Sequence, residues 1–148
     1  MAVERLVYTD GACLGNPGPG GWAWFEPLTG RRASGSEAQT TNQRMELTAV
    51  LRALEADPAP LVLVRSDSQY VVRCFQERWW ARWRQNGFRN AKGQPVSNRD
   101  LWELVLRLVL DEGRSVRFEW VRGHAGDPGN EEVDRLAQAA ARAVARGV

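Results

Sequence analysis

The chain has 148 residues, of which 43% are hydrophobic and 26% are charged, and its formal net charge is +2. This composition is typical of one globular domain, so we expect a single domain over residues 1–148. No apolar run approaches the roughly 20 residues that cross a bilayer, and the N-terminus lacks a secretion-signal pattern. We therefore expect a cytoplasmic protein with no membrane partner. Two cysteines, Cys13 and Cys74, exclude a disulfide framework, and no paired Cys/His spacing suggests structural zinc.

Apolar runs separated by turn signals predict three strands at the start of the chain. The first covers Leu6–Thr9, the second runs from about Trp22 to Phe25, and Arg31–Ala38 returns as a partly exposed third. A loop rich in glycine and proline is expected over residues 11–21, with a fixed shape and little side-chain bulk. Taken alone, it is equally well read as a hairpin connection in which Asp10 caps a turn.

The middle of the chain predicts helices on either side of a buried strand. Thr40-Thr41-Asn42 offers N-cap residues for a helix that runs to about Glu55. The continuous apolar run Leu61–Val64 predicts a strand buried on both faces. A second helix can start at Ser66-Asp67-Ser68, and a short third helix should precede Asn86-Gly87.

The last third of the chain predicts two more helices and one more strand. Asn98 can cap a helix over Leu101–Leu110, and the alternation of apolar and polar residues over Val116–Trp120 predicts a strand. A loop covers Arg122–Gly129, and a final helix runs from Asn130 to about Arg146. Strands before and after helices indicate an α/β domain whose sheet mixes an antiparallel meander with parallel strands.

Two aspartates, Asp10 and Asp67, each follow an apolar strand and precede a structural break. If the two strands are parallel neighbours, their C-terminal ends bring both carboxylates together. That end of an α/β sheet is where sites commonly form.

Glu46 lies inside the apolar arc of its helix when residues are placed at about 100° intervals. A carboxylate there costs several kcal/mol unless its charge is compensated. An internal arginine, Arg44 or Arg65, is one candidate compensator and a metal ion is the other.

Asp134 lies at the edge of the apolar side of the last helix, where it could reach a site at the sheet's end. By itself it would be only a surface aspartate. Together with the other acids it forms a set of hard oxygen ligands suited to Mg²⁺ or Mn²⁺. Two such ions about 4 Å apart would serve phosphoryl transfer. His124, the single histidine, is either incidental or a proton shuttle near that site.

Residues 73–93 carry six basic side chains against one acid, so the segment is +5 while the remainder, with 14 basic and 17 acidic residues, is −3. Trp79, Trp80, Trp83 and Phe88 are interleaved with these charges. Such a pattern suits nucleic acid. The alternative is an amphipathic helix with a solvated cationic side and tryptophans in the core.

Five passages, TDGACLGNPGPGGW, TTNQRMELTAV, SDSQYV, NRDLW and WVRGHAGDPGNEEVDRLA, occur in this order over nearly the whole chain. Together they resemble type 1 ribonuclease H, the bacterial form that cuts the RNA strand of RNA/DNA hybrids. The resemblance implies a ribonuclease H-like fold, a central five-stranded mixed sheet flanked by helices. It also implies a monomer whose partner is an RNA/DNA hybrid, cut to leave 5′-phosphate and 3′-hydroxyl ends.

The resemblance assigns catalytic roles to Asp10, Glu46, Asp67 and Asp134 as ligands of two Mg²⁺ ions, with Mn²⁺ as a substitute. Asp10 would lie between the ions, and His124 matches a loop histidine that assists proton transfer or product release.

The resemblance also assigns substrate contacts, in three groups. The RNA strand and minor groove are matched by Cys13, Asn16, Asn42 and Gln69. A pocket for a phosphate of the DNA strand is matched by Thr41 and Asn98. Aromatic residues beside the DNA strand are matched by Trp79 and Trp102. Contacts to 2′-hydroxyls would distinguish RNA from DNA, and the hybrid would otherwise be recognised by its shape and backbone.

The chain departs from the family pattern at several places. Gln43 replaces the second of two paired asparagines, and Gln39 stands where some members have an arginine. Arg84-Gln85-Asn86 is less basic than in relatives, which predicts weaker hybrid binding. Two rival functions stay open: a non-catalytic hybrid-binding module, and an integrase- or resolvase-like nuclease. All four carboxylates oppose the first, and the RNA-contact motifs oppose the second.

Overall fold

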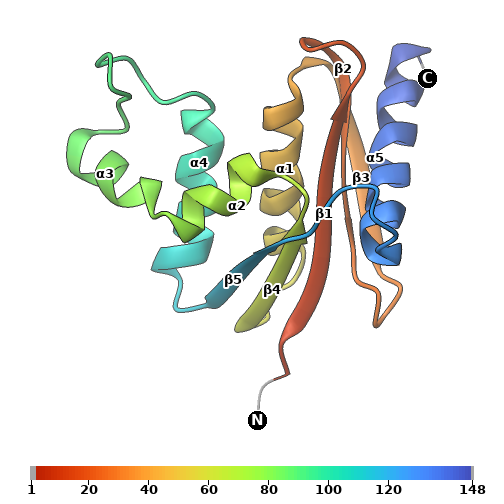
Figure 1. The fold of residues 1–148 in the computed structure, drawn as a ribbon, viewed down its shortest axis with the longest axis horizontal. Helices are drawn as coiled ribbons and strands as arrows, with labels where there is room; N and C mark the ends of the chain where they lie inside the picture. The colour runs from red at the N-terminus through yellow and green to blue at the C-terminus, as the bar shows by residue number, and fades with distance from the viewer. Residues whose placement is uncertain (1–2, 148) are drawn as a thin grey trace.

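In a computed structural model that describes residues 3–147, one five-stranded sheet runs through the centre of the molecule (Figure 1). Its strand order is β3-β2-β1-β4-β5. The central β1 pairs antiparallel with β2 and parallel with β4, and β4 pairs parallel with β5. The strands are β1 (Arg5–Cys13), β2 (Gly18–Phe25), β3 (Arg32–Thr40), β4 (Leu61–Ser66) and β5 (Ser115–Trp120). The predicted combination of an antiparallel meander with parallel strands is confirmed.

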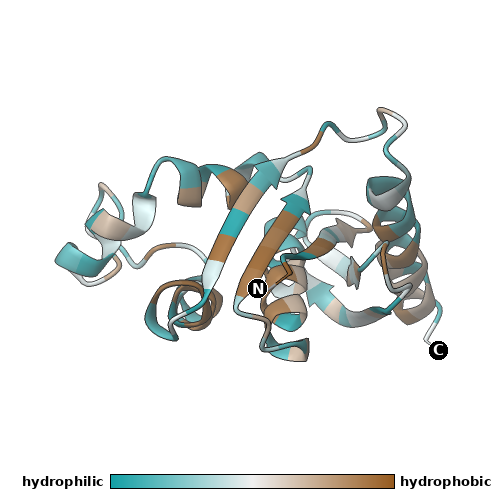
Figure 2. Ribbon diagram, turned by 90° about the horizontal axis from the view of Figure 1, so that it is seen from below, coloured by the Kyte–Doolittle hydropathy of each residue, from teal (hydrophilic) through white to brown (hydrophobic). Residues whose placement is uncertain are grey.

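Helices cover both faces of this sheet, as Figure 1 shows, with α1 and α5 on opposite sides of β1 and β2. The helices are α1 (Asn42–Ala56), α2 (Gln69–Gln76), α3 (Trp79–Asn86), α4 (Arg99–Leu106) with a π-helical turn at Arg107–Asp111, and α5 (Pro128–Ala145). Because strand side chains alternate between faces, Val7 joins the core under α1 while Tyr8 joins the smaller core under α5. Hydrophobic residues accordingly lie along the central strands and the helix faces turned toward them (Figure 2).

The expected loop over residues 11–21 is wrong in its extent. The β1–β2 ladder continues to the Cys13–Gly20 pair, which leaves only residues 14–17 as the connecting turn. Two of its glycines, Gly11 and Gly21, serve helix packing instead. A Cβ at Gly21 would lie 2.3 Å from the carbonyl oxygen of Ala137, so α5 can pack directly on β2 only because that side chain is missing.

Side-chain caps fix where three helices start. Thr41 and Ser68 accept hydrogen bonds from the backbone N–H groups of Arg44 and Val71, both at 3.2 Å, as expected for α1 and α2. The last helix starts earlier than predicted because Asp127 caps it, accepting from Gly129 N at 3.0 Å.

Asn98 is a correction. It occupies the N-cap position of α4 with a φ of 60°, but its side chain makes no capping hydrogen bond. The amide contacts other side chains instead, and these contacts bear on the site below.

No helix formed by the described residues 3–147 has both the length and the apolarity needed to cross a membrane.

Candidate active site

Asp10 and Asp67 end up beside each other through the register of two parallel strands. Thr9 pairs with Ser66, so the two aspartates are the next residue on each chain. Asp10 is 5% exposed and accepts a hydrogen bond from Gly11 N at 2.9 Å. The juxtaposition expected from the two strand ends is therefore confirmed.

Glu46 reaches the same place because α1 crosses β1 at very short range. A Cβ on Gly11 would lie 2.3 Å from the backbone nitrogen of Glu46, so a residue with a side chain would push the helix away. One turn earlier on α1, the Asn42 amide donates a hydrogen bond to Glu46 Oε1. Helix α1 thus brings a third carboxylate to the end of β1.

The arginines proposed as partners of Glu46 pair elsewhere. Arg44 forms an ion pair with Asp100 at 2.6 Å, and Arg65 forms one with Glu119, also at 2.6 Å. The ion-pair alternative for Glu46 is therefore wrong. No basic side chain within residues 3–147 forms an ion pair with Glu46.

Asp134 approaches from α5 on the other face of the sheet and is half-buried. Its charge raises the pKa of both Asp10 and Asp67. His124 lies exposed on the loop before α5 with a φ of 56°, and its charge slightly lowers the pKa of Asp67. All five residues predicted to be catalytic are thus electrostatically connected through Asp67 or Asp10.

The acidic cluster holds more negative charge than its surroundings compensate. Burial and then the charges of Asp67 and Asp134 place the pKa of Asp10 far above its ordinary value. Burial raises the pKa of Glu46 to about 7, although a hydrogen bond from Ser68 opposes the rise. Mutual repulsion of this kind is relieved by protons or by a cation.

The donor chemistry of the cluster fits a hard divalent ion, since carboxylate oxygens are the ligands that Mg²⁺ and Mn²⁺ prefer. In residues 3–147, no three His, Cys, Asp or Glu side chains yet have the geometry of a formed ion cage.

A polar groove of about 740 Å³ opens beside the cluster. Glu46 and Asp67 line the groove together with five of the residues predicted to contact substrate: Asn16, Thr41, Asn42, Gln69 and Asn98. These five lie in the β1–β2 turn and at or next to the starts of α1, α2 and α4. The turn is tied to α1 because Asn42 N donates to Asn16 Oδ1 at 3.1 Å. The groove therefore has predicted substrate residues and carboxylates on one continuous surface.

Three predicted substrate residues lie outside the groove. The Cys13 thiol donates to Gly15 O at 2.7 Å within the β1–β2 turn. Trp79 lines a separate hollow on α3 and donates to Glu77 at 3.1 Å. Trp102 is a correction: its side chain is 0% exposed in the core, so it supports the groove from beneath and does not face a ligand.

Tyr70 and Trp120 are among the groove residues that the sequence reasoning missed. Trp120 is 42% exposed, and its indole N–H donates to the backbone carbonyl of Asp67 at 3.1 Å. The alternation over β5 predicted only a strand, and the β4–β5 register, which pairs Ser66 with Trp120, reveals that Trp120 lies beside Asp67.

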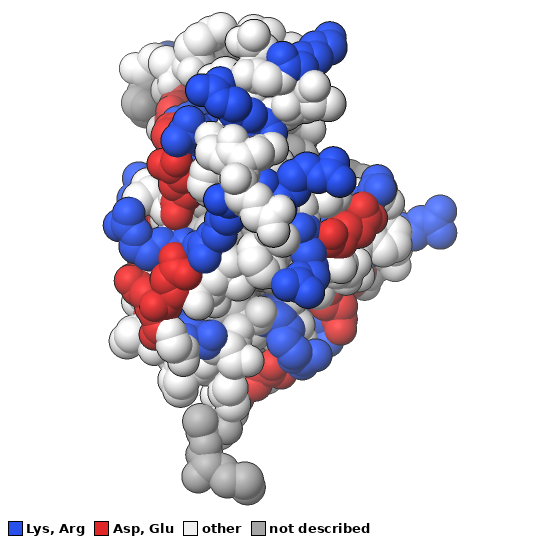
Figure 3. All heavy atoms as spheres, turned by 90° about the vertical axis from the view of Figure 1, so that its left-hand side faces the viewer, with Lys and Arg blue, Asp and Glu red and all other residues white. Residues whose placement is uncertain are grey.

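The tryptophans of the basic aromatic segment are half-buried, which is close to the amphipathic-helix alternative. Trp79, Trp80 and Trp83 of α3 pack against the edge of the main core. Lys and Arg side chains gather on this end of the molecule with acids interspersed (Figure 3). Arg84 is held by Asp111 at 2.8 Å, and this pairing lowers the charge available to a polyanion. Nucleic-acid binding by this segment stays a prediction.

Comparisons with known proteins agree with this geometry. The family model described as RNase H matches residues 3–142. A ribonuclease H of Nitratidesulfovibrio vulgaris is 52% identical over 142 residues, covering 93% of this chain and 89% of the relative. A ribonuclease H of Thermus thermophilus is 49% identical over 143 residues, covering 95% and 85%. The crystal structure of LC9-RNase H1, a type 1 RNase H with the type 2 active-site motif, is 33% identical with a TM-score of 0.78, covering 97% of this chain and 75% of that one.

Proposed function

The chain belongs to the ribonuclease H family, and from that premise we propose that it is an endonuclease that hydrolyses the RNA strand of RNA/DNA hybrids. The products would carry 5′-phosphate and 3′-hydroxyl ends. The match over residues 3–142 further supports the proposal that residues 1–148 form one ribonuclease H domain, and we expect it to act as a monomer.

One observation supports this proposal: four acidic side chains from three layers of the fold interact electrostatically, and within residues 3–147 none of them forms an ion pair with an arginine or lysine. A stability-driven core would not retain such a cluster, because each uncompensated buried carboxylate destabilises the folded state. A divalent ion resolves the repulsion.

Asp10, Glu46, Asp67 and Asp134 would hold two Mg²⁺ ions, or Mn²⁺ in their place, which supply activated water and stabilisation of the leaving oxygen. Hydrogen bonds already orient two of these groups: Gly11 N–H donates to the Asp10 carboxylate, and the Asn42 amide donates to the Glu46 carboxylate. His124, exposed beside Asp67, would move a proton at the leaving oxygen.

Substrate recognition would follow the groove. Asn16, Asn42 and Gln69 present amide groups suited to reading 2′-hydroxyls. Thr41 and Asn98 would hold a phosphate further along the same groove, and Trp79 and the basic residues around it would extend contact to the DNA strand. The contribution of Cys13 would be to shape the turn that carries Asn16.

A strand-specific cleavage assay tests this function. The wild-type protein is incubated with hybrids labelled on the RNA or the DNA strand, and with duplex DNA, in Mg²⁺ or in EDTA. We expect cuts in the RNA strand of the hybrid and only with metal. Binding without cleavage in both Mg²⁺ and Mn²⁺ would favour the non-catalytic module, and cleavage of duplex DNA would favour the integrase-like nuclease.

A further inference from the structure

Tyr70, in the first turn of α2, sits between the core and the groove. Its ring packs edge-on against Trp102 with centroids 5.5 Å apart, and the residue lines the groove together with Asn98. Its hydroxyl oxygen accepts from the Trp102 indole N–H at 2.7 Å and from the Asn98 amide at 3.3 Å.

The direction of both hydrogen bonds is fixed by chemistry. An indole N–H can only donate, so the Tyr70 oxygen must accept from Trp102. The amide oxygen of Asn98, Oδ1, accepts from an Arg44 NH group at 3.5 Å. Since a guanidinium also has donors only, the amide oxygen must face Arg44 and the NH₂ group must face Tyr70.

Arg44 is itself held in place from the other side. Asp100 accepts from both of its NH groups, at 3.0 and 2.6 Å. A bidentate pair of this type fixes the plane of the guanidinium. A chain of fixed polarity therefore runs from Asp100 through Arg44 and Asn98 to Tyr70.

The consequence concerns the hydroxyl proton of Tyr70. A phenol oxygen has two acceptor sites and one proton, and Trp102 and Asn98 occupy both acceptor sites. Within residues 3–147 the proton has no acceptor. The core side of the oxygen is filled, so the proton is left to point into the groove.

The groove wall around Tyr70 offers donors and carries no charge of its own. Thr41 Oγ1 accepts from Arg44 N at 3.2 Å, so its proton is also free. The acceptor-only side chains that line the groove, Glu46 and Asp67, belong to the acidic cluster. An anionic oxygen entering the groove is attracted to the donor wall and repelled from the acidic one.

We propose that the Tyr70 hydroxyl is a substrate-binding donor to a backbone phosphate of the hybrid, preset by Trp102 and Asn98 acting behind it. The proposal rests on the proposed function and extends it, because it gives Trp102 a positioning role in substrate binding. The phosphate lies on the strand opposite the one that is cut, because the carboxylates engage the cut strand at the other wall of the groove.

Tyr70→Phe removes the hydroxyl and leaves the ring. We expect the Kd for a labelled RNA/DNA hybrid, measured by fluorescence anisotropy in EDTA, to rise about 10-fold, the effect of losing one hydrogen bond to a charged group. Trp102→Phe tests the positioning role, because it removes the donor behind Tyr70 but keeps the hydroxyl. Its Kd should rise less than about 3-fold, while its melting temperature falls.

The double variant Tyr70→Phe/Trp102→Phe separates binding from structural damage. Tyr70→Phe alone leaves the Trp102 N–H without an acceptor, whereas the double variant removes both partners and avoids that cost. We expect the double variant to bind as weakly as Tyr70→Phe. Recovery of wild-type affinity would overturn the proposal, because the single variant's loss would then be distortion.

Hybrids in which a single phosphate is replaced by an uncharged analogue identify the contacted phosphate. Hybrids with one methylphosphonate at successive positions of the DNA strand should show a position whose penalty is present in the wild type and absent in Tyr70→Phe. Equal penalties at every position, or a Kd for Tyr70→Phe within 2-fold of wild type, would overturn the inference. If the wild type neither binds nor cuts hybrid, the proposed function itself fails, which is a distinguishable result.

Discussion

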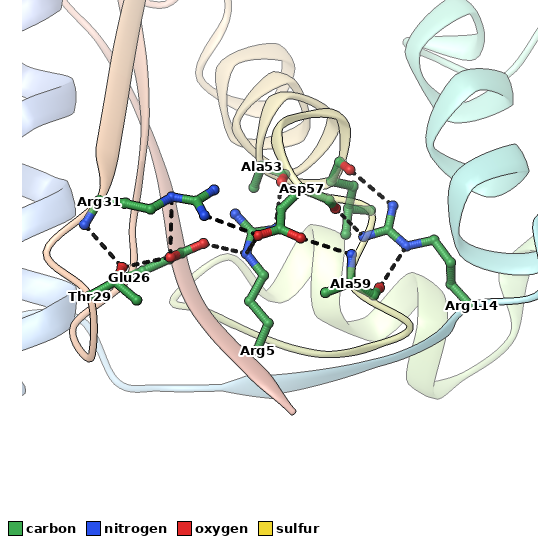
Figure 4. A network of polar contacts seen from close by, with 9 residues as sticks. Arg5, Glu26, Thr29, Arg31, Ala53, Asp57, Ala59 and Arg114 are labelled. Atoms are coloured by element: carbon green, nitrogen blue, oxygen red, sulfur yellow. Dashed lines mark hydrogen bonds and ion pairs between the residues drawn. The ribbon is translucent and has the colours of Figure 1, made fainter. Parts of the chain in front are cut away.

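The two ends of the central sheet treat buried carboxylates in opposite ways. At the end that holds the N-terminus of β1, Glu26 is 3% exposed and is paired with the guanidinium of Arg5 (Figure 4). Arg31 lies 3.6 Å from the same carboxylate and donates to Asp57 at 3.2 Å. At the opposite end, Asp10 is 5% exposed and its charged neighbours are other carboxylates.

The paired end also anchors the last turn of α1. Arg5 donates to Ala53 O at 2.7 Å, and Arg114 donates to the carbonyls of Leu54, Asp57 and Ala59 at 2.8–3.1 Å (Figure 4). These guanidinium groups satisfy carbonyls that a helix end leaves without partners.

The presence or absence of a cationic partner therefore distinguishes a structural buried carboxylate from a candidate functional one. Both ends contain carboxylates removed from water, but only one supplies matching cations. The paired end holds the strands and α1 together, whereas the unpaired end keeps a negative potential that an external cation must neutralise. Removal of a charge should therefore have opposite consequences at the two ends.

Asp10→Asn should have the largest effect on activity. We expect cleavage of hybrid in Mg²⁺ to fall by about 10³-fold or more, because a charged ligand at the centre of the cluster is lost. Hybrid affinity should change little. Initial cleavage rates measure the activity, and fluorescence anisotropy measures the hybrid affinity. The control is Glu131→Gln, which removes an exposed acid in the first turn of α5 and should cleave normally. Substantial cleavage by Asp10→Asn would contradict the assignment.

Arg5→Met should have the largest effect on stability. It leaves Glu26 buried without its cation, and breaking a buried pair costs about 3–5 kcal/mol of the free energy of unfolding. Urea denaturation measures this cost. The double variant Arg5→Met/Glu26→Gln should recover part of it, and the folded variants should keep their cleavage rate at low temperature. A loss of activity without a loss of stability would break the division between the two ends.

Glu46→Gln should change how stability depends on pH. The pKa of Glu46 rises from 4.5 to about 7 on folding, so this group's contribution to stability is complete below pH 4.5 and is lost as the pH rises through 7. In EDTA, the wild type should lose about 2.5 kcal/mol of the free energy of unfolding from this group between pH 5 and pH 8. Urea denaturation at the two pH values should show a smaller loss in Glu46→Gln. If Glu46→Gln had the same pH dependence of stability as the wild type, the negative charge of Glu46 would be neutralised within the folded protein.

Trp120→Phe should have the smallest effect. The variant loses the indole donor to the Asp67 carbonyl, a hydrogen bond worth about 1 kcal/mol. We expect kcat to fall about 3- to 10-fold with little change in KM, measured by steady-state cleavage. Trp24→Phe makes the same chemical change beside Arg5, at the paired end of the sheet, and should leave kcat unaltered. Equal effects of the two substitutions would show that Trp120 contributes only packing.

Much of the site could be predicted because its residues sit in unusual local settings. Asp10 and Asp67 follow apolar strands, and Glu46 violates the apolar face of its helix, so each is visible from the neighbouring sequence. The prediction of an α/β domain with a mixed sheet followed from the same runs.

What escaped prediction depends on contacts between distant segments. Gly21 was assigned to a loop because glycine signals turns, yet its role is to admit α5, which lies more than 100 residues away in sequence. Whether Arg44 compensated Glu46 or Asp100 could not be decided without the geometry of α4. Trp120 and Tyr70 carry no local signal, since their function arises from hydrogen bonds across the fold.

The most direct test of the central claim is the melting temperature as a function of Mg²⁺ concentration at pH 8, compared between wild type and Asp10→Asn. An ion that binds only the folded protein raises its stability. In EDTA, Asp10→Asn should melt at a higher temperature than the wild type, because it lacks a buried carboxyl group whose raised pKa destabilises the folded state at this pH. Added Mg²⁺ should raise the melting temperature of the wild type and not that of the variant. A lower melting temperature for Asp10→Asn in EDTA, with equal responses of both proteins to Mg²⁺, would contradict the claim that this cluster is an unpaired metal site.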